Sequence, residues 1–258
     1  MCRSVRQLTR EKAVPKCFRP GENGDAMPPT FKPKLEILPP AQLRLWDELG
    51  NVPSQFTLYG GTAIALHLGH RQSADFDFFG SADFDPDVLL QTTPFLKDAT
   101  VTQKSPDTLT AIVDRGDPVQ VSFFGLPGFT RINKPHPVDT NNLNVASILD
   151  LAGAKAAVVQ KRAEAKDYID IDAMIQSKAV SLSQALAAGK VIYGSQFNPQ
   201  VTLKALCYFE DGTVNTLPAN TRERLVEAVR SVDLANLPTL EKSPHKTVDR
   251  ERDRGMER

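Results

Sequence analysis

The chain has few cysteines and no long apolar run, and each shortage excludes a class of protein. Its three cysteines, Cys2, Cys17 and Cys207, lie scattered among 258 residues without metal-ligand spacing, which argues against a disulfide framework and suits a reducing compartment. No uninterrupted apolar stretch approaches the ~20 residues of a membrane span. The basic N-terminus also lacks the apolar segment of a signal peptide. We therefore expect a cytoplasmic protein with no membrane partner.

An excess of charge of either sign is also missing. Lysine plus arginine and aspartate plus glutamate each number 31. A formal net charge of zero gives no reason to expect stable binding to duplex DNA. The hydrophobic share of 41% and the charged share of 24% are ordinary for a globular protein, so the sequence predicts a packed core.

Apolar periodicity is missing at both ends and changes in kind along the body. Residues 1–30 and 241–258 are polar or rich in arginine, lysine and proline, so we expect disordered tails that cannot offset their ordering entropy. Residues 31–140 mix short apolar runs with helical patterns, whereas residues 141–240 are helical almost throughout. The sequence therefore predicts an α+β fold, with an α/β domain over 31–140 and a helical domain over 141–240.

Short apolar runs bounded by turn residues predict the individual elements. The expected strands are 56–59, 75–79, 101–103, 108–113 and 119–124, and the expected helices of the first domain are 41–49, 62–68 and 86–90. Residues 127–144 are predicted to be a loop-rich connection. Breaks in the helical half are expected near Lys178, Gly194 and Gly212.

A pair of glycines follows the first expected strand. The sequence Tyr59-Gly60-Gly61-Thr62 runs from a short apolar strand into a helix. Glycines let a backbone approach a ligand closely, and the free amides of a helix N-terminus attract anions. No lysine-serine or lysine-threonine pair follows, so a Walker loop is excluded. The pattern indicates an anion-binding turn, with a plain strand-to-helix turn as the alternative.

Two aspartates share one face of a later strand. In Asp75-Phe76-Asp77-Phe78, alternation puts both carboxylates on one face and both phenylalanines on the other. Two like charges so close are unfavourable unless a cation lies between them, and Mg²⁺ bridging to substrate phosphates is the usual solution. Solvated acids on a half-exposed strand are the alternative, although aspartate is a poor strand former.

Charged residues interrupt the apolar pattern of the helical half. Lys155 lies in an apolar stripe with Leu151 and Val159, where a lysine must reach solvent or meet an anion. Asp170 follows in a charged segment whose basic residues recur every four positions. We predict functional roles for Lys155 and Asp170. For the neighbouring acids we expect salt bridges on the helix surface; these acids are Glu164, Asp167 and Asp172.

Together these segments resemble the AbiEii/AbiGii toxin family of nucleotidyltransferases, a branch of the polymerase-β-like superfamily. The matching segments are Gly60-Gly61-Thr62-Ala63 with Leu66, Gly69-His70-Arg71, residues 73–79, 121–124 and 146–155, and Arg162 with residues 166–170. The similarity covers roughly residues 35–240. It implies a nucleotidyltransferase-type mixed sheet with flanking helices, followed by a C-terminal helical bundle that closes a nucleotide cleft.

The resemblance also implies an activity and roles for single residues. The activity is Mg²⁺-dependent transfer of a nucleotidyl group from an NTP to an acceptor, such as a tRNA or another RNA, with an antitoxin as partner. Asp75 and Asp77 match the metal-binding acids, and Asp170 matches an aspartate that assists the acceptor. The nucleotide-binding positions are Gly60, Gly61, Thr62, Arg71, Ser73 and Lys155.

One departure from the family pattern leaves alternatives open. Related enzymes carry a third carboxylate on a later strand, where this chain has Ser122, a poor Mg²⁺ ligand. Asp170 could supply the missing function, two acids could hold a single metal, or the protein could be a catalytically weak regulator that binds a nucleotide or RNA. A haloacid dehalogenase-type phosphatase ranks last, because a hydrophobic strand does not precede Asp75.

Overall fold

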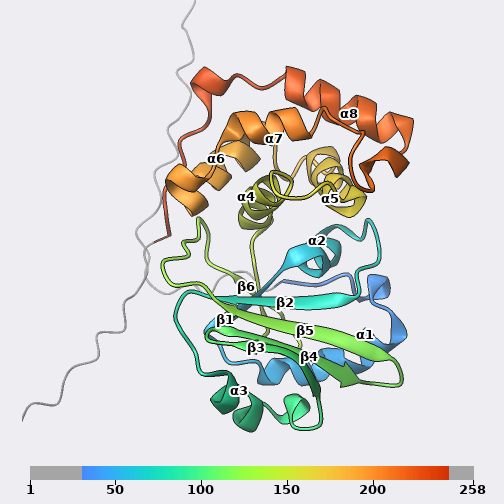
Figure 1. Cartoon of the computed structure of the whole chain (residues 1–258), viewed down its shortest axis with the longest axis vertical. Helices are drawn as coiled ribbons and strands as arrows, with labels where there is room; N and C mark the ends of the chain where they lie inside the picture. Colours follow the sequence, from blue (N-terminus) through green and yellow to red (C-terminus); the bar gives the residue numbers. More distant parts are fainter. Residues whose placement is uncertain (1–30, 244–258) are drawn as a thin grey trace, which may run out of the picture.

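The computed structural model describes residues 31–243. A seven-stranded mixed sheet carries α1 and α3 on one side, while α2 and the C-terminal helices lie on the other (Figure 1). The α+β class expected from the sequence is confirmed. Apart from residues 241–243, the two predicted tails lie outside the described residues. Within residues 31–243 the longest apolar helices are too short to cross a membrane.

The sheet has the strand order β3-β4-β5-β2-β1-β7-β6. Its two central strands, β1 and β2, run antiparallel, and β2 pairs in parallel with β5. The strands are β1 Phe56–Tyr59, β2 Asp75–Gly80, β3 Thr100–Ser105, β4 Thr108–Asp114, β5 Pro118–Gly125, β6 His136–Pro137 and β7 Asn144–Val145. The five strands predicted from apolar runs are all present, most of them one or two residues longer than expected.

One strand, β6, lies inside the segment 127–144 that was predicted to be a loop, and β7 begins at its last residue. β6 and β7 span two residues each and pair antiparallel with each other, and Val145 of β7 pairs in parallel with Leu58 of β1. Strands this short have no apolar alternation for a sequence pattern to reveal. Because β7 belongs to the sheet, the sheet extends past residue 140. The division of the chain into two domains at residue 140 stays a prediction.

Three breaks between the C-terminal helices fall where they were predicted, and the break between α4 and α5 was not among the predicted ones. The α-helices are α1 Pro40–Trp46, α2 Gly60–Leu68, α3 Pro86–Thr92, α4 Ile148–Val158, α5 Ala165–Gln176, α6 Leu182–Tyr193, α7 Pro199–Ala205 and α8 Ala219–Arg230. Short 3₁₀ helices are η1 Leu35–Ile37, η2 Asp47–Asn51, η3 Pro94–Leu96, η4 Gly194–Gln196, η5 Val214–Thr216 and η6 Leu234–Asn236. The helical half breaks where Lys178, Gly194 and Gly212 take positive φ angles of 60°, 57° and 51°, as expected of left-handed backbone.

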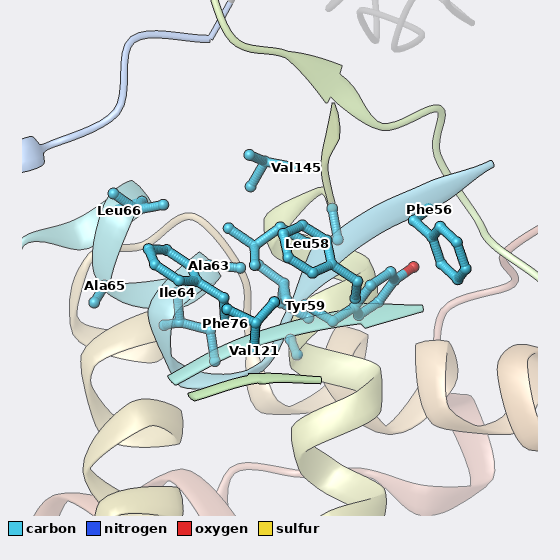
Figure 2. Close-up of a cluster of buried hydrophobic side chains, with 14 of the residues drawn as sticks. Phe56, Leu58, Tyr59, Ala63, Ile64, Ala65, Leu66, Phe76, Val121 and Val145 are labelled. Carbon is cyan, nitrogen blue, oxygen red and sulfur yellow. The ribbon is translucent and has the colours of Figure 1, made fainter. Parts of the chain in front are cut away.

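The junction of β1 and α2 is the part of the core that positions the site (Figure 2). All four residues of β1 are buried, and α2 contributes Ala63, Ile64, Ala65 and Leu66, each without exposed surface. Small alanines let α2 lie close to β1 and β2 while it also contacts α4 and α5. The N-terminus of α2 is therefore held between the sheet and the C-terminal helices.

Candidate active site

Alternation along β2 separates its acids from its aromatic residues, as the sequence predicted. Phe76 and Phe78 are fully buried in the core, whereas Asp75 is exposed and Asp77 is half-buried on the opposite face. Within residues 31–243 neither carboxylate accepts a hydrogen bond or joins an ion pair. The pair is therefore free to meet a ligand.

Burial raises the pKa of Asp77, and the neighbouring charge of Asp75 raises it further. The more distant charges of Lys155, Arg162 and Lys166 offset only part of this rise. Two carboxylates in one half-buried place repel each other, which is the electrostatic situation that a bound cation relieves.

The two glycines at the start of α2 make room for side chains of the site. Gly60 has a φ of 73°, and a β-carbon there would lie 2.6 Å from Oδ2 of Asp77. A β-carbon on Gly61 would collide with the guanidinium of Arg71 and lie 3.1 Å from Oγ of Ser73. Larger residues would therefore displace Asp77 and Arg71, so the glycine pair is required by the packing of the site itself.

Thr62 is placed differently from the other predicted site residues. Its side chain is buried, and its hydroxyl donates a hydrogen bond to the backbone carbonyl of Asp75. Thr62 does not line the cavity described below. It joins the first turn of α2 to the start of β2 and so fixes the glycine turn relative to the acids.

A cavity of about 420 Å³ lies between the acid-bearing face of the sheet and the helices α4 and α5. Its lining brings together most of the predicted residues, namely Gly60, Gly61, Arg71, Ser73, Asp75, Asp77 and Lys155. Basic residues that the prediction did not assign also line it: Lys161, Arg162 and Lys166. The lining further includes Tyr59, Phe79, Phe124 and Tyr193. The cavity therefore combines acids, cations and aromatic rings.

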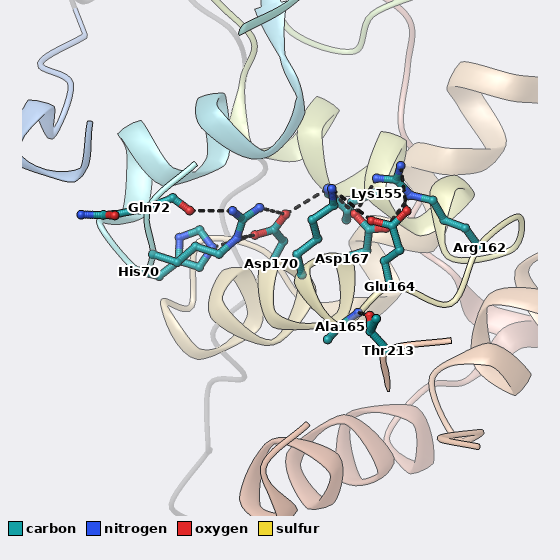
Figure 3. Close-up of polar contacts among 11 residues, drawn as sticks. His70, Gln72, Lys155, Arg162, Glu164, Ala165, Asp167, Asp170 and Thr213 are labelled. Carbon is teal, nitrogen blue, oxygen red and sulfur yellow. Dashed lines mark hydrogen bonds and ion pairs between the residues drawn. The ribbon is translucent and has the colours of Figure 1, made fainter. Parts of the chain in front are cut away.

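Asp170 is the centre of a buried ion-pair network rather than a lining residue (Figure 3). Arg71 donates to its two oxygens from Nε and Nη2, at 2.7 and 2.9 Å. His70 Nε2 lies 2.8 Å from Oδ1, and Lys155 Nζ lies 2.9 Å from Oδ2. The carboxylate has no exposed surface. Asp170 thus fixes two cavity-lining cations, Arg71 and Lys155.

Those partners control the ionisation of Asp170. Burial alone would raise its pKa, but the hydrogen bonds from His70 and Arg71 and the charge of Lys155 hold the pKa well below its usual range. In residues 31–243 no three acidic, histidine or cysteine side chains gather into a metal site. Asp170 therefore does not join Asp75 and Asp77 as a third carboxylate.

Asp167 is a second buried acid of the network, and the surface role expected for it is wrong. Its carboxylate has no exposed surface and accepts from Lys155 Nζ at 2.8 Å and from Arg162 Nε at 2.8 Å. Lys155 is thus shared between Asp167 and Asp170. Asp172 is buried as well, against Arg224 at 2.9 Å. Only Glu164, with 37% of its side chain exposed, keeps the expected surface position.

Burial of these acids could have been inferred from one signal in the sequence. Lys155 falls in an apolar stripe and needs an acidic partner, and α5 carries acids at positions 167 and 170, which lie within one turn of each other. The cavity-lining Lys161 lies in the turn between α4 and α5 and follows no periodic pattern, so the sequence carried no signal for it.

A family of known proteins matches most of this chain. A family model described as nucleotidyl transferase AbiEii toxin, type IV TA system, matches residues 44–249. The chain belongs to this family. It is therefore a nucleotidyltransferase, as the resemblance of its motifs predicted.

Two further relatives are more distant. An uncharacterized protein of Aquifex aeolicus is 28% identical over 160 residues, which cover 61% of this chain and 75% of that protein. The structure of MenT4, a nucleotidyltransferase toxin of Mycobacterium tuberculosis, superposes with a TM-score of 0.50 at 15% identity, over 76% of this chain and 85% of MenT4. At that identity the AbiEii-family chain and MenT4 share a fold, and the site must be argued from its own residues.

Proposed function

We propose that the protein transfers a nucleotidyl group from an NTP to a hydroxyl of an RNA acceptor, with Asp75 and Asp77 holding Mg²⁺. One observation carries the proposal. On β2, two carboxylates that have no partner among residues 31–243 face the cations of α4 and α5 across a single cavity. A metal-bound triphosphate has the matching charges, because its metal suits the acids and its phosphates suit the cations.

The residues present fit the proposed Mg²⁺. Asp75 and Asp77 offer carboxylate oxygens, the donors that Mg²⁺ prefers. Burial and, after it, the charge of Asp75 raise the pKa of Asp77, and a cation between the two carboxylates would offset both effects. Bound there, Mg²⁺ would neutralise phosphate charge and orient the phosphates for attack.

Backbone amides and basic side chains of this chain would bind the phosphates together with Mg²⁺. The amides of Gly60 and Gly61 open the N-terminus of α2, where partial positive charge accumulates. Arg71 and Lys155 are held rigidly by Asp170, so little reorganisation is needed when phosphate charge arrives. In the proposed reaction the acceptor oxygen bonds to the α-phosphorus, the bond from that phosphorus to the β-phosphate oxygen breaks, and pyrophosphate leaves with the acceptor proton released to solvent.

In this proposal Asp170 is a positioning residue instead of an acid that assists the acceptor. Its two oxygens are occupied by Arg71, His70 and Lys155. A carboxylate with a lowered pKa and four donors around it is a weak proton acceptor.

A binding-only regulator is the second candidate function, and Ser122 favours it. Ser122 stands opposite Asp77 in the β2–β5 register and is buried, with the Thr110 hydroxyl 3.3 Å from its own. The strand that would present a third acid therefore presents a neutral hydroxyl. Such a protein would bind a nucleotide or RNA in the same cavity without turnover.

Incubation with radiolabelled nucleotides separates the two candidates. The purified protein is mixed with each α-labelled NTP, Mg²⁺ and total cellular RNA, and labelled RNA is sought on a gel. An active transferase labels RNA with at least one NTP. Because losing a residue that merely supports a metal costs about 10- to 100-fold, Asp77→Asn should lower the rate by at least about 100-fold. NTP binding without labelled product in the wild-type protein supports the regulator.

We also propose that an antitoxin is the genetic partner, which the family's description as part of a TA system supports. Expression of the wild-type chain in a bacterial host would then arrest growth. Expression of Asp77→Asn at the same level would leave growth intact. Growth arrest by both chains would separate toxicity from nucleotidyl transfer and count against the proposal.

A further inference from the structure

Three rows of side chains lie on β2 and β5 at the cavity, and four of the six residues line it: Asp75, Asp77, Phe79 and Phe124. The parallel register pairs Asp75 with Gln120, Asp77 with Ser122 and Phe79 with Phe124. Side chains two positions apart on a strand share a face, so Phe79 continues the line of the two acids. The third row therefore replaces carboxylates with aromatic rings on the same face.

These two rings differ from the other aromatic residues of the sheet. Phe79 and Phe124 are half-buried and line the cavity. Phe78 and Phe123, which precede them, have no exposed surface and stack on each other inside the core, 5.1 Å apart. The core is thus complete without the third row. The rings of Phe79 and Phe124 leave apolar surface open to the cavity.

Neighbouring rings hold the third row in place. Tyr59 stacks on Phe79 at 4.8 Å with an interplanar angle of 10°, and Phe124 meets Phe79 edge-on at 5.7 Å. Phe129 packs edge-on against both Tyr59 and Phe79. Tyr193, at the end of α6, adds a fourth ring to the cavity wall. We call the four lining rings the aromatic shelf; they are Tyr59, Phe79, Phe124 and Tyr193.

We propose that the aromatic shelf binds the nucleobase of the NTP, an inference that rests on the proposed nucleotidyl transfer. Phe79 lies two residues beyond Asp77, or about 7 Å along the strand, a distance that a ribose spans between its phosphate and its base. Each nucleobase has a π-face that stacks on aromatic side chains. The acids and cations would then hold the phosphates while the shelf holds the base.

Two ligands that differ only in the base test this assignment. Dissociation constants are measured with Mg²⁺ for an NTP and for ribose 5-triphosphate, which carries the same phosphates and sugar. Because stacking on an aromatic side chain is worth ~1–3 kcal/mol per base, Phe124→Ala should weaken NTP binding by about 5- to 150-fold. The same variant should bind ribose 5-triphosphate within about twofold of the wild-type protein, a difference below 0.5 kcal/mol.

Two more variants keep the test decisive. Phe209→Ala removes a half-buried ring that packs on Tyr168, outside the cavity lining, and should change neither constant. Phe124→Leu keeps apolar volume but removes the π-face, and it gives the answer if Phe124→Ala does not fold. We expect Phe124→Leu to lower NTP affinity selectively.

The outcomes separate this inference from the proposed function. Equal affinity of the wild-type protein for the two ligands, or equal weakening of both by Phe124→Leu, would overturn the base-binding shelf while leaving phosphate binding intact. Failure of the wild-type protein to bind either ligand would instead count against the proposed nucleotidyl transfer.

Discussion

Two pairs of aspartates near the cavity differ in whether the protein itself neutralises their charge. Asp75 and Asp77 project from β2 without protein partners among residues 31–243, and burial with mutual repulsion raises the pKa of Asp77. Asp167 and Asp170 project from α5 into a buried network of cations, which hold both of their pKa values below the usual range despite burial.

The difference lies in which cation each pair is built to meet. The α5 pair is neutralised by Arg71, Lys155 and Arg162 of the same chain. It therefore contributes to the free energy of unfolding and needs no ligand to do so. The β2 pair keeps an unfavourable charge that a ligand must relieve. A site of this kind trades stability for binding, and each half of the comparison can be tested separately.

The largest expected effect is on stability, from loss of charge at Asp170. Asp170→Asn leaves the half-buried Arg71 and the buried Lys155 with one carboxylate fewer, and breaking a buried pair in this way costs about 3–5 kcal/mol. Urea unfolding near neutral pH measures this loss. Since the pKa of Asp170 is lowered in the folded state, its contribution is present above the unfolded pKa and is lost as pH falls toward the folded value. A loss below about 1 kcal/mol would show that the network is not stabilising.

The elements of the fold were largely predictable because their signals are local. The alternation of Asp75 to Phe78 predicted both the strand and its faces. Helix breaks were predicted near Gly194 and Gly212, and both glycines take positive φ angles in the structure. β6 and β7 escaped because two-residue strands are defined by a partner far away in the sequence.

The site was predictable only as a set of residues. Motif order indicated the acids, the glycines and Lys155, but the partners of Asp170 depend on three segments that meet in space, around positions 70, 155 and 170. A sequence pattern gives spacing within a segment, and the sharing of Lys155 between two acids is a property of packing between α4 and α5. The apolar stripe around Lys155 did signal a buried acidic partner, but the ion pair of Asp167 with both Lys155 and Arg162 follows from this packing.

The next expected effect concerns the one cation of the cavity wall that no acid holds. Lys161 is exposed, lines the cavity and forms no ion pair among the described residues. If the proposed triphosphate binds, Lys161→Ala should weaken it about tenfold, since a hydrogen bond to a charged group is worth ~1.5–3 kcal/mol. Titration calorimetry with an NTP and Mg²⁺ measures this change.

Lys97→Ala provides the matched control for Lys161→Ala. Lys97 is also an exposed lysine; it follows η3 and does not line the cavity, so its loss should leave NTP affinity unchanged. Equal effects of the two substitutions would mean that Lys161 acts only through overall charge. Neither variant should unfold at a lower urea concentration than the wild-type protein, in contrast to Asp170→Asn.

A smaller effect of opposite sign is expected for the β2 pair. Because the folded pKa of Asp77 is raised, its ionised form destabilises the protein at pH values above that pKa, and the penalty disappears below the unfolded pKa. Asp77→Asn should therefore stabilise the metal-free protein near neutral pH, by an amount of order 0.5 kcal/mol. The difference in unfolding free energy between Asp77→Asn and the wild-type protein should shrink when urea unfolding is measured at successively lower pH, down to about pH 3. Destabilisation at neutral pH would place Asp77 with the structural acids of α5.

The smallest expected effect comes from Glu164, the one acid of the basic wall that remains partly exposed. Its oxygens lie 3.3 Å from Arg162 Nη1 and 3.0 Å from Lys166 Nζ, and both cations line the cavity. Glu164 therefore competes with phosphates for them. Because an exposed ion pair contributes at most ~1 kcal/mol, Glu164→Gln should tighten NTP binding only about two- to threefold. The gain should shrink as salt is raised, since exposed charges are screened. Weaker binding would instead mean that Glu164 positions Arg162 and Lys166 for the phosphates, in the way that the buried Asp167 positions Lys155 and Arg162.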